Sequence, residues 1–256
     1  MFWFAYFWLV LRYTNKFLMN AAIDIGNTKA KLGFFKENEL VAYKAFNELK
    51  ELADEIKKSE VSKVIISSVR EDDESIKKIL DLREDPFFLN YKTPVPFVNN
   101  YQSPTLGLDR IAIVAGAQTL FPDQHTLAID LGTCITYDFL EAGIQYHGGA
   151  ISPGMHMRFK ALHNFTARLP LINPAQQVDV IGNSTENSIQ SGVVHGVSGE
   201  IRAFINTYKE KYNPLNVIIT GGDAKYFESK IKATIFAIPE LVLVGLNAIL
   251  RHNASI

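Results

Sequence analysis

The feature that most constrains how this chain can fold is a short acidic hairpin motif that occurs twice. Residues 21–33 read A-A-I-D-I-G-N-T-K-A-K-L-G, and residues 127–138 read L-A-I-D-L-G-T-C-I-T-Y-D. In each copy an apolar run carries one aspartate into a tight turn, after which the alternation typical of a β-hairpin resumes. Internal repetition of this kind indicates a duplicated supersecondary unit. We therefore predict two copies of one βββ-α unit.

The composition of both turns favours phosphate binding. Glycine lets the backbone approach a ligand closely, and consecutive N–H groups in such a turn form an anion-binding concavity. An aspartate beside this concavity is useful where a cation lies between the carboxylate and a phosphate. An ordinary hairpin with a surface aspartate explains either copy alone, but chance would rarely supply both. The corresponding residues of the two copies are Asp24 and Asp130, Gly26 and Gly132, and Thr28 and Thr133.

Composition narrows the class of protein. With 256 residues, of which 47% are hydrophobic, the chain can bury a large core as one large domain or two modest ones. A formal net charge of −1 gives no basic surface for nucleic acid, so we expect no nucleic-acid partner. The single cysteine, Cys134, excludes an intramolecular disulfide framework and fits a reducing compartment, which predicts a cytoplasmic protein.

Residues 1–18 differ from the rest of the chain. Residues 1–11 are almost all aromatic or aliphatic, but the run stops at Arg12, whereas a transmembrane helix needs roughly 20 apolar residues. The run lacks the preceding positive charge and the following small-residue cleavage site of a secretory signal. Because Met19 directly precedes the first predicted strand, we interpret 1–18 as an upstream extension outside the fold and expect no membrane partner. A membrane-surface anchor is the alternative.

Hydrophobic periodicity predicts most of the remaining elements. Two segments carry apolar residues on one helical face, and a β-branched run suits a buried parallel strand. A long helix opens within 182–192 and ends near Tyr212, and the strand that follows ends in Gly221-Gly222-Asp223, a turn that lets a phosphate or a flat ring approach the backbone. The predicted ranges are helices at 48–58 and 72–82, strands at 31–35, 40–46, 64–69, 95–98 and 217–220, and a last strand at 241–244 followed by a helix at 245–250.

A second informative stretch is 101–121. A polar loop that begins Y-Q-S-P-T leads into G-L-D-R, and the next seven residues, I-A-I-V-A-G-A, carry no polar side chain. That pattern predicts a helix buried all round, as between two lobes. The helix dipole explains Asp109 in the first turn, by about 0.3–1 kcal/mol, but the same dipole disfavours the adjacent Arg110. A site that uses both signs of charge explains the pair better.

Five motifs together resemble one known family. In order they are D-I-G-N-T-K-A-K, G-L-D-R, D-L-G-T-C-I-T-Y-D, G-G-A-I-S-P-G and I-T-G-G-D, and they cover the chain from Met19 to its end. They resemble the type III pantothenate kinases of the acetate and sugar kinase, actin and heat-shock chaperone ATPase superfamily. The resemblance implies an α/β, duplicated ribonuclease-H-like fold, with lobes at 19–122 (including a connecting helix) and 123–256 and a cleft between them. It also implies ATP-dependent phosphorylation of pantothenate to 4′-phosphopantothenate, the first step of coenzyme A biosynthesis.

The resemblance assigns roles to individual residues. It implies that Asp109 is the general base, that Asp130 is the ligand of a monovalent cation, potassium or ammonium, and that Thr185 reaches a site completed in a homodimer. The segment from Tyr101 to Gly107 is about one residue shorter than the family pattern. The implied ATP-binding residues are Asp24, Ile25, Gly26, Asn27, Thr28, Lys29, Ala30, Lys31 and Thr133, and the implied pantothenate-binding residues are Tyr101, Gly107, Leu108, Asp109, Arg110 and Thr185.

The chemistry of phosphoryl transfer agrees with these roles, because it depends on positioning and charge neutralisation more than on covalent chemistry. Asp24 and Asp130 can hold Mg²⁺, directly or through water, and a monovalent cation against the ATP phosphates, and Lys31 can hold phosphate oxygens. Asp109 would accept the proton of the pantothenate hydroxyl, although an aspartate is a weak base for an alcohol and orientation is its larger contribution. Arg110 is predicted to pair with the pantothenate carboxylate.

Two other classes of function stay open. Another small-molecule kinase of the superfamily would keep both hairpins and change the acceptor pocket. A non-catalytic nucleotide-binding regulator would keep the fold without the base. The joint presence of Asp24, Asp109 and Asp130 argues against the regulator. The G-L-D-R segment argues against another kinase, through resemblance alone.

Overall fold

A computed structural model describes residues 19–254, so the predicted upstream extension at 1–18 lies outside the described residues. Contacts within the chain divide it into two units. The first contains the described residues up to Thr93 and those from Leu246 onward, and the second is Pro94–Gly245. The predicted lobe boundary after residue 122 stays a prediction. The division by contacts groups the helix Leu108–Leu120 with the second unit.

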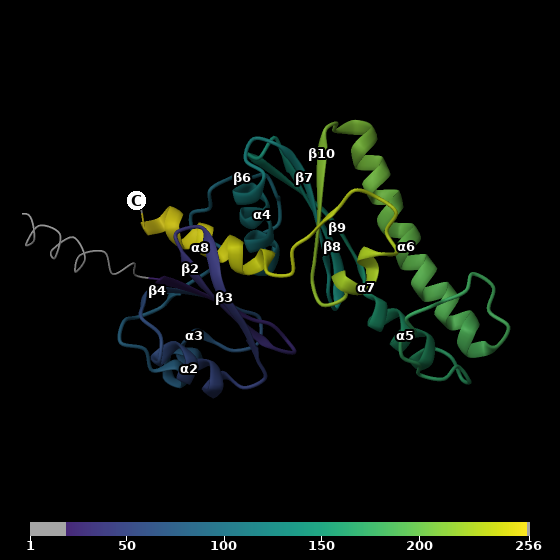
Figure 1. Ribbon diagram of the computed structural model, residues 1–256, viewed down its shortest axis with the longest axis horizontal. Coiled ribbons are helices and arrows are strands. Elements are labelled where there is room, and N and C mark those ends of the chain that lie inside the picture. Colours follow the sequence, from purple (N-terminus) through teal and green to yellow (C-terminus); the bar gives the residue numbers. More distant parts are fainter. Residues whose placement is uncertain (1–18, 255–256) are drawn as a thin grey trace, which may run out of the picture. The chain divides into compact units, whose positions relative to one another are not determined.

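The first unit contains a five-stranded sheet in the order β3-β2-β1-β4-β5. Its first three strands form an antiparallel meander, and β4 and β5 continue the sheet parallel to β1. Alternate residues of β1 pack with two amphipathic helices in one hydrophobic core, and Figure 1 shows these helices, α2 and α3, together. The elements are β1 Met19–Ile25, β2 Ala30–Lys36, β3 Glu39–Phe46, α2 Leu49–Lys57, β4 Val61–Ser68, α3 Asp73–Leu80 and β5 Phe87–Phe88.

The second unit repeats this topology. Its sheet has the order β11-β10-β7-β8-β9-β6, with the same strand directions from β9 to β11 as the first sheet has from β3 to β5. Only β6, which is parallel to β9, is additional. The repetition confirms the duplicated three-stranded unit that the hairpin motifs predict. The strands are β6 Val98–Asn99, β7 His125–Leu131, β8 Cys134–Glu141, β9 Gln145–Pro153, β10 Leu215–Thr220 and β11 Phe236–Ala237.

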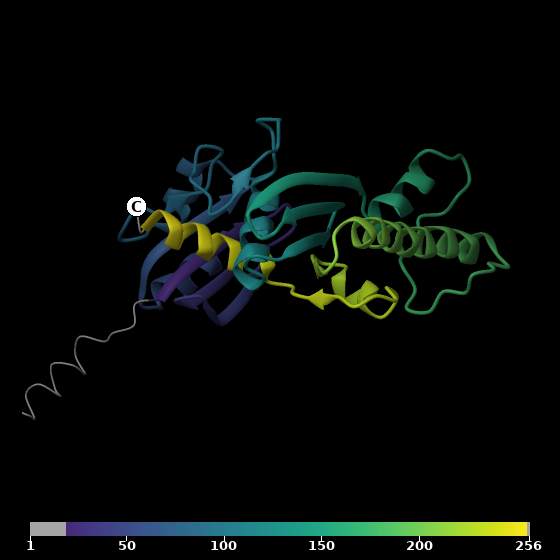
Figure 2. The ribbon, with the colours of Figure 1, turned by 90° about the horizontal axis from the view of Figure 1, so that it is seen from above.

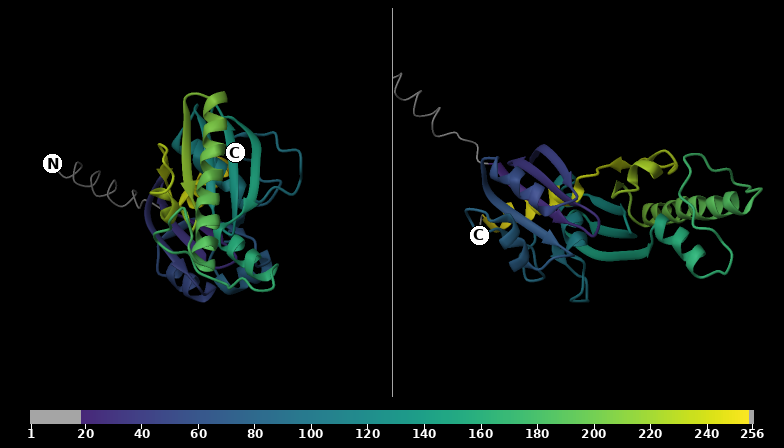
Figure 3. Two further views of the ribbon diagram at one scale, coloured as in Figure 1. Left: turned by 90° about the vertical axis from the view of Figure 1, so that its right-hand side faces the viewer. Right: turned by 90° about the horizontal axis from the view of Figure 1, so that it is seen from below.

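Helices cover both faces of the second sheet. On one face, alternate residues of β7 and β8 form a core with α5 and α6, which lie side by side in Figure 2. Figure 3 shows α6 running across this face. The opposite face contacts α4, in which every residue from Arg110 to Ala117 is buried, so the predicted buried helix is confirmed. The helices are α4 Leu108–Leu120, α5 Met155–Asn164, α6 Thr185–Lys211 and α7 Ala224–Glu228.

The predicted last strand at 241–244 is wrong, because these residues begin helix α8, Leu241–Ala254. A short apolar run does not distinguish a strand from a buried helix. Gly245 allows this helix to pack closely on α4, because a Cβ atom there would lie 1.7 Å from the carbonyl oxygen of Ala112. The predicted strand at 95–98 is reduced to β6. No helix among the described residues is long and apolar enough to cross a membrane.

Candidate active site

The hairpin of the first unit places an acid and a lysine side by side. Asp24 is the penultimate residue of β1, and Lys31 of β2 lies directly opposite it in the antiparallel register. Residues in this relation point to the same face, with Cβ atoms about 4.5–5.5 Å apart. A hydrogen bond from the Gly26 N–H to the Lys29 carbonyl, at 3.1 Å, closes the loop, and its tip at 27–29 is exposed. The hairpin therefore has an exposed tip and places the lysine side chain beside the aspartate.

The hairpin of the second unit repeats this arrangement with two differences. Asp130 is again the penultimate residue of its strand, but its opposite neighbour is Thr136 and not a lysine. The loop runs over 132–134, compared with 26–29 in the first copy, and is therefore one residue shorter. Thr133 is exposed at its tip. The second copy therefore has a hydroxyl where the first has a lysine directly opposite the aspartate.

The carboxylate of Asp130 lies against two glycine turns. A Cβ atom on Gly221, which has a φ of +93°, would lie 2.2 Å from Asp130 Oδ1, and one on Gly132 would lie 3.6 Å from it. The Asp223 N–H donates to the Leu131 carbonyl at 2.9 Å and so ties the Gly-Gly-Asp turn to β7. Only a residue without a side chain fits at Gly221, which keeps backbone close to the carboxylate.

This chemistry fits a hard cation. Carboxylate, carbonyl and hydroxyl oxygens are the ligands that Mg²⁺ and similar ions prefer. Among residues 19–254, no three His, Cys, Asp or Glu side chains form a group that could hold a metal ion. A cation at Asp130 would therefore take its other ligands from backbone, hydroxyl, water or phosphate oxygens.

The first turn of α4 presents Asp109. Gly107 precedes the helix, and a Cβ atom there would lie 2.3 Å from Asp109 Oδ1, so the glycine makes room for the carboxylate. Asp109 Oδ1 accepts a hydrogen bond from the Arg110 N–H at 2.8 Å. The side chain is partly exposed. Asp109 is thus oriented by the helix start while it keeps access to a ligand.

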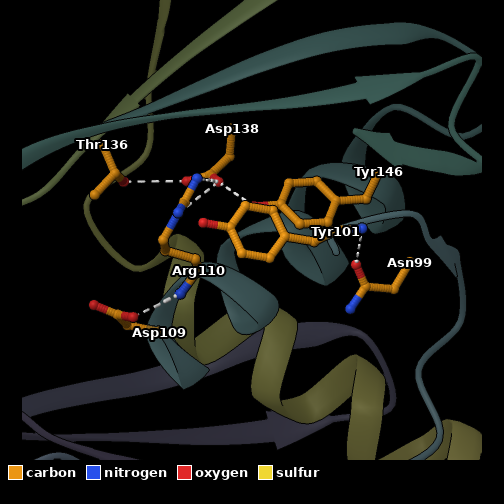
Figure 4. Close-up of polar contacts among 7 residues, drawn as sticks. All are labelled: Asn99, Tyr101, Asp109, Arg110, Thr136, Asp138 and Tyr146. Carbon is orange, nitrogen blue, oxygen red and sulfur yellow. Dashed lines mark hydrogen bonds and ion pairs between the residues drawn. The ribbon is translucent and has the colours of Figure 1, made fainter. Parts of the chain in front are cut away.

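Arg110, the next residue, turns inward and pairs with Asp138 of β8. Its Nε and Nη2 lie 2.9 and 2.8 Å from Asp138 Oδ1. The same oxygen accepts a hydrogen bond from the Tyr146 hydroxyl at 2.7 Å, and Oδ2 accepts one from the Thr136 hydroxyl at 3.1 Å. Figure 4 shows these groups converging on the carboxylate. Asp138 is only 1% exposed and Arg110 only 5%.

The electrostatics of this cluster are those of a compensated buried pair. Burial raises the pKa of the Asp138 carboxyl, while Arg110, Tyr146 and Thr136 oppose that rise. Burial has the largest single effect on the pKa of Arg110 and would lower it, but the charge and hydrogen bond of Asp138, together with Tyr146 and Tyr101, outweigh it and the net direction is upward. Burial, followed by the charge of Asp138, raises the pKa of Tyr146, which therefore stays a hydrogen-bond donor. Removing one partner of such a pair typically costs about 3–5 kcal/mol.

Tyr101 covers the arginine from the loop before α4. The guanidinium carbon lies 5.4 Å from the centre of the Tyr101 ring, within the range of a cation–π contact. The ring also stacks on Tyr146, with centroids 6.2 Å apart, and its backbone N–H donates to Asn99 Oδ1 at 3.0 Å. The structure thus brings together Tyr101 and Arg110, which the motifs predict as site residues.

Thr185 lies apart from the cluster around Arg110. It is the first residue of α6, exposed, and it follows Ser184, whose hydroxyl caps the helix by accepting from the Asn187 N–H at 3.1 Å. No lining residue of its groove belongs to the Arg110 cluster. Of the residues described, the groove is lined by Leu162, Leu169, Gly182, Asn183, Ser184, Thr185, Ser188, Ile189 and Gly192.

The sequence reasoning missed Asp138, Thr136 and Tyr146. Asp138 ends the second hairpin motif, so it is visible in the sequence, but its role depends on which face of β8 it occupies. The alternation along β8 carries that signal, because Ile135, Tyr137 and Phe139 belong to the apolar core while the residues between them point to α4.

Comparisons with known proteins give the family. A family model described as type III pantothenate kinase matches residues 20–207. A type III pantothenate kinase from Cytophaga hutchinsonii is 43% identical over 236 residues, which cover 92% of this chain and all of that protein.

Solved structures give the fold alone. A Baf family protein from Campylobacter jejuni superposes with a TM-score of 0.60 at 23% identity, covering 92% of this chain and all of its own. A glucokinase from an Antarctic psychrotroph superposes with a TM-score of 0.53 at 11% identity, covering 93% and 100%. These likenesses agree with the duplicated ribonuclease-H-like fold.

Proposed function

The chain belongs to the type III pantothenate kinase family, and we propose that the two acidic hairpins and the start of α4 carry out that family's reaction. The enzyme transfers a phosphoryl group from ATP to pantothenate and forms 4′-phosphopantothenate, the first step of coenzyme A biosynthesis. The observation that carries this conclusion is the identity to a curated relative over the whole length of that relative. Neither alternative class, another small-molecule kinase of the superfamily or a non-catalytic nucleotide-binding regulator, accounts for it. The lone cysteine also supports our proposal of a cytoplasmic location.

We propose that the ATP phosphates contact both hairpins. The exposed tip of the first hairpin and Lys31 beside Asp24 supply donors and positive charge, and Thr133 supplies a hydroxyl from the second. ATP arrives with a divalent metal, as in the kinase family generally. The proposed ATP-binding residues are Asp24, Ile25, Gly26, Asn27, Thr28, Lys29, Ala30, Lys31 and Thr133.

Asp130 is proposed to bind a monovalent cation, K⁺ or NH₄⁺, next to the phosphates. The close approach of Gly132 and Gly221 to its carboxylate supports this role, because it keeps oxygen-bearing backbone near the acid. Such a cation would supply at the second hairpin the positive charge that Lys31 supplies at the first.

The acceptor side is proposed to lie at the start of α4, over Gly107, Leu108, Asp109 and Arg110. Asp109 receives and orients the primary hydroxyl of pantothenate, while Arg110 faces its carboxylate and Tyr101 covers the chain between them. The proximity of Tyr101 to the Arg110 guanidinium supports this grouping.

A homodimer is the proposed assembly, with Thr185 completing the pantothenate site of the partner. Apolar residues near Thr185 are strongly exposed in the described chain, among them Phe165 at 88%, Val180 at 75% and Ile181 at 85%. Exposed apolar residues gathered in one region mark interaction surfaces. Glycines at 192, 196 and 199 of α6, where a Cβ atom would meet nothing, leave room for a second chain to approach.

A coupled ADP-release assay tests acceptor and cation together. ADP release should require pantothenate and should be faster in KCl than in NaCl at equal ionic strength. Asp130→Asn should lower the rate and remove most of the difference between the two salts. Equal rates in both salts would contradict the cation proposal, and ADP release with sugars but not with pantothenate would contradict the assigned reaction.

A further inference from the structure

The buried carboxylate of Asp138 is arranged so that it can hold the guanidinium of Arg110 in only one orientation. Both of its oxygens have donors, since Oδ1 receives Arg110 and Tyr146 and Oδ2 receives Thr136. A carboxylate that accepts on both oxygens cannot rotate without losing a hydrogen bond. At 1% exposure, water cannot replace that bond.

We propose that Asp138 is a positioning residue for pantothenate, which acts through Arg110 and touches no substrate atom itself. The proposal rests on the assigned reaction and on the role of Arg110 given above. Asp138 engages Nε and Nη2 of the guanidinium, and Tyr101 covers its face. Among the described residues, Nη2 is buried and makes no hydrogen bond of good geometry although it lies 2.8 Å from Asp138 Oδ1, so the guanidinium keeps a donor for a ligand carboxylate. The position of Asp138 on β8 thereby sets the direction from which the Arg110 guanidinium can bind the pantothenate carboxylate.

A contribution to folding stability alone does not explain why Arg110 and Asp138 form a buried ion pair. Replacing a buried ion pair with apolar residues of similar size is often neutral or stabilising. A guanidinium is, however, a planar group with donors in a fixed fork, so its orientation decides which ligand geometry it can bind. The value of Asp138 would then lie in orientation, which substrate affinity measures. The melting temperature of Asp138→Asn should fall as well, because the substitution leaves Arg110 buried without its charged partner.

The chain contains a matched control pair on the opposite face of the same sheet. Glu200 of α6 accepts a hydrogen bond from the Tyr137 hydroxyl at 2.9 Å and pairs with Arg158 at 2.5 Å. Like Asp138, this carboxylate combines an arginine with a tyrosine hydroxyl. It contacts none of the proposed substrate residues, so its loss should affect stability only.

Steady-state kinetics of Asp138→Asn and Glu200→Gln, with thermal unfolding of both, test the proposal. Asp138→Asn should raise the KM for pantothenate about tenfold or more while the KM for ATP stays within about twofold. Glu200→Gln should lower the melting temperature and leave both KM values within about twofold. An unchanged pantothenate KM in folded Asp138→Asn, or an equal rise in Glu200→Gln, overturns the proposal.

A double-mutant comparison shows whether Asp138 acts through Arg110. If it does, Arg110→Ala and the double variant Arg110→Ala/Asp138→Asn should have the same pantothenate KM, since the second change removes nothing further. Additive increases would overturn the mechanism. If Arg110→Ala itself leaves the pantothenate KM unchanged, the assigned role of Arg110 fails as well, whereas a raised KM in Arg110→Ala alone with no effect of Asp138→Asn refutes only this proposal.

Tyr146→Phe provides a milder variant should Asp138→Asn fold poorly. It keeps the charge of Asp138 and removes a single donor. We expect the pantothenate KM to rise by about two- to fivefold with the ATP KM unchanged, which corresponds to the loss of one hydrogen bond. No change in the pantothenate KM of folded Tyr146→Phe would contradict a positioning network.

Discussion

Asp109 and Asp138, two acids of the second unit, have different surroundings, and we assign them different roles. Asp109 is partly exposed and accepts a hydrogen bond from the adjacent backbone N–H, so part of its carboxylate stays accessible to a ligand. Asp138 is buried and saturated with donors, so it cannot. The first arrangement suits a residue that meets a hydroxyl, and the second suits one that holds another side chain.

Asp109→Asn tests the first assignment. The amide keeps the shape of the side chain but cannot accept the hydroxyl proton, so kcat should fall by about 10²–10⁴-fold. The dissociation constant for ATP, measured by calorimetry, should change little. Asp73→Asn, which alters another first-turn aspartate in α3, is the control and should retain the wild-type rate. Full activity of Asp109→Asn would remove Asp109 from the mechanism.

Gly148→Ala tests whether the Tyr101 ring contributes to pantothenate binding. Gly148 has a φ of +87°, and a Cβ atom there would lie 2.8 Å from the Tyr101 ring, so the ring must move. The pantothenate KM should rise by about three- to tenfold, in line with the loss of about 0.6–1.4 kcal/mol of binding free energy. The KM for ATP should not change.

Gly143→Ala is the matched control for backbone strain. Gly143 also has a positive φ, of +68°, but its Cβ atom would meet the backbone of Asp123 and not Tyr101. This variant should lose stability without a change in the pantothenate KM. A similar KM increase in both variants would show that strain, and not the tyrosine, causes the effect.

At this scale, a site residue could be predicted from the sequence when the residues that define its role lie close to it along the chain. The hairpin acids were found because each is defined by its own turn, and Asp109 and Arg110 because adjacent opposite charges are unusual at a helix start. The partner of Arg110 was missed because Asp138 lies 28 residues further on, and only the strand register brings the two together.

At the scale of elements, the two hairpins are alike in position and different in charge. Both acids are penultimate in their strands, but one faces a lysine and the other a threonine. The repeat predicted the three-stranded unit of each sheet, and the helix at 245–250 was predicted as well. Only the start of α8, residues 241–244, was predicted wrongly, as a strand, because a four-residue apolar run fits either structure.

Gly245→Ala tests the close contact between α8 and α4. Here a methyl group would collide with the backbone of α4, so the free energy of unfolding should fall by about 1–3 kcal/mol and the melting temperature by several degrees. Gly222→Ala is the control, because a Cβ atom there would meet nothing. Equal melting temperatures of the two variants would mean that the helices do not pack closely.

At the scale of the whole molecule, the same topology occurs in both units, and each contains one copy of the hairpin that we propose to bind phosphate. The proposed acceptor residues Tyr101, Asp109 and Arg110 all lie within the second unit, Pro94–Gly245. Thr185 is in the same unit but lines a separate groove, which is why its proposed role requires a second chain.

Mixing two inactive variants tests that requirement. If Thr185 completes the partner's site, a dimer of one Asp109→Asn chain and one Thr185→Ala chain contains one intact site. After statistical exchange about half of the dimers are mixed, so about a quarter of the wild-type rate should return at limiting pantothenate. Each variant alone should stay well below this value. No gain on mixing, with exchange verified by mass spectrometry, would place Thr185 outside the partner's site.

The most direct test of the central claim is a crystal structure of the chain with pantothenate and a non-hydrolysable ATP analogue in a potassium and magnesium buffer. We predict that the nucleotide phosphates or their metal ions contact both the Asp24 and the Asp130 hairpins. Asp109 should lie within hydrogen-bond distance of the pantothenate primary hydroxyl. Phosphates bound by one hairpin only, or a pantothenate hydroxyl that faces away from Asp109, would contradict the account.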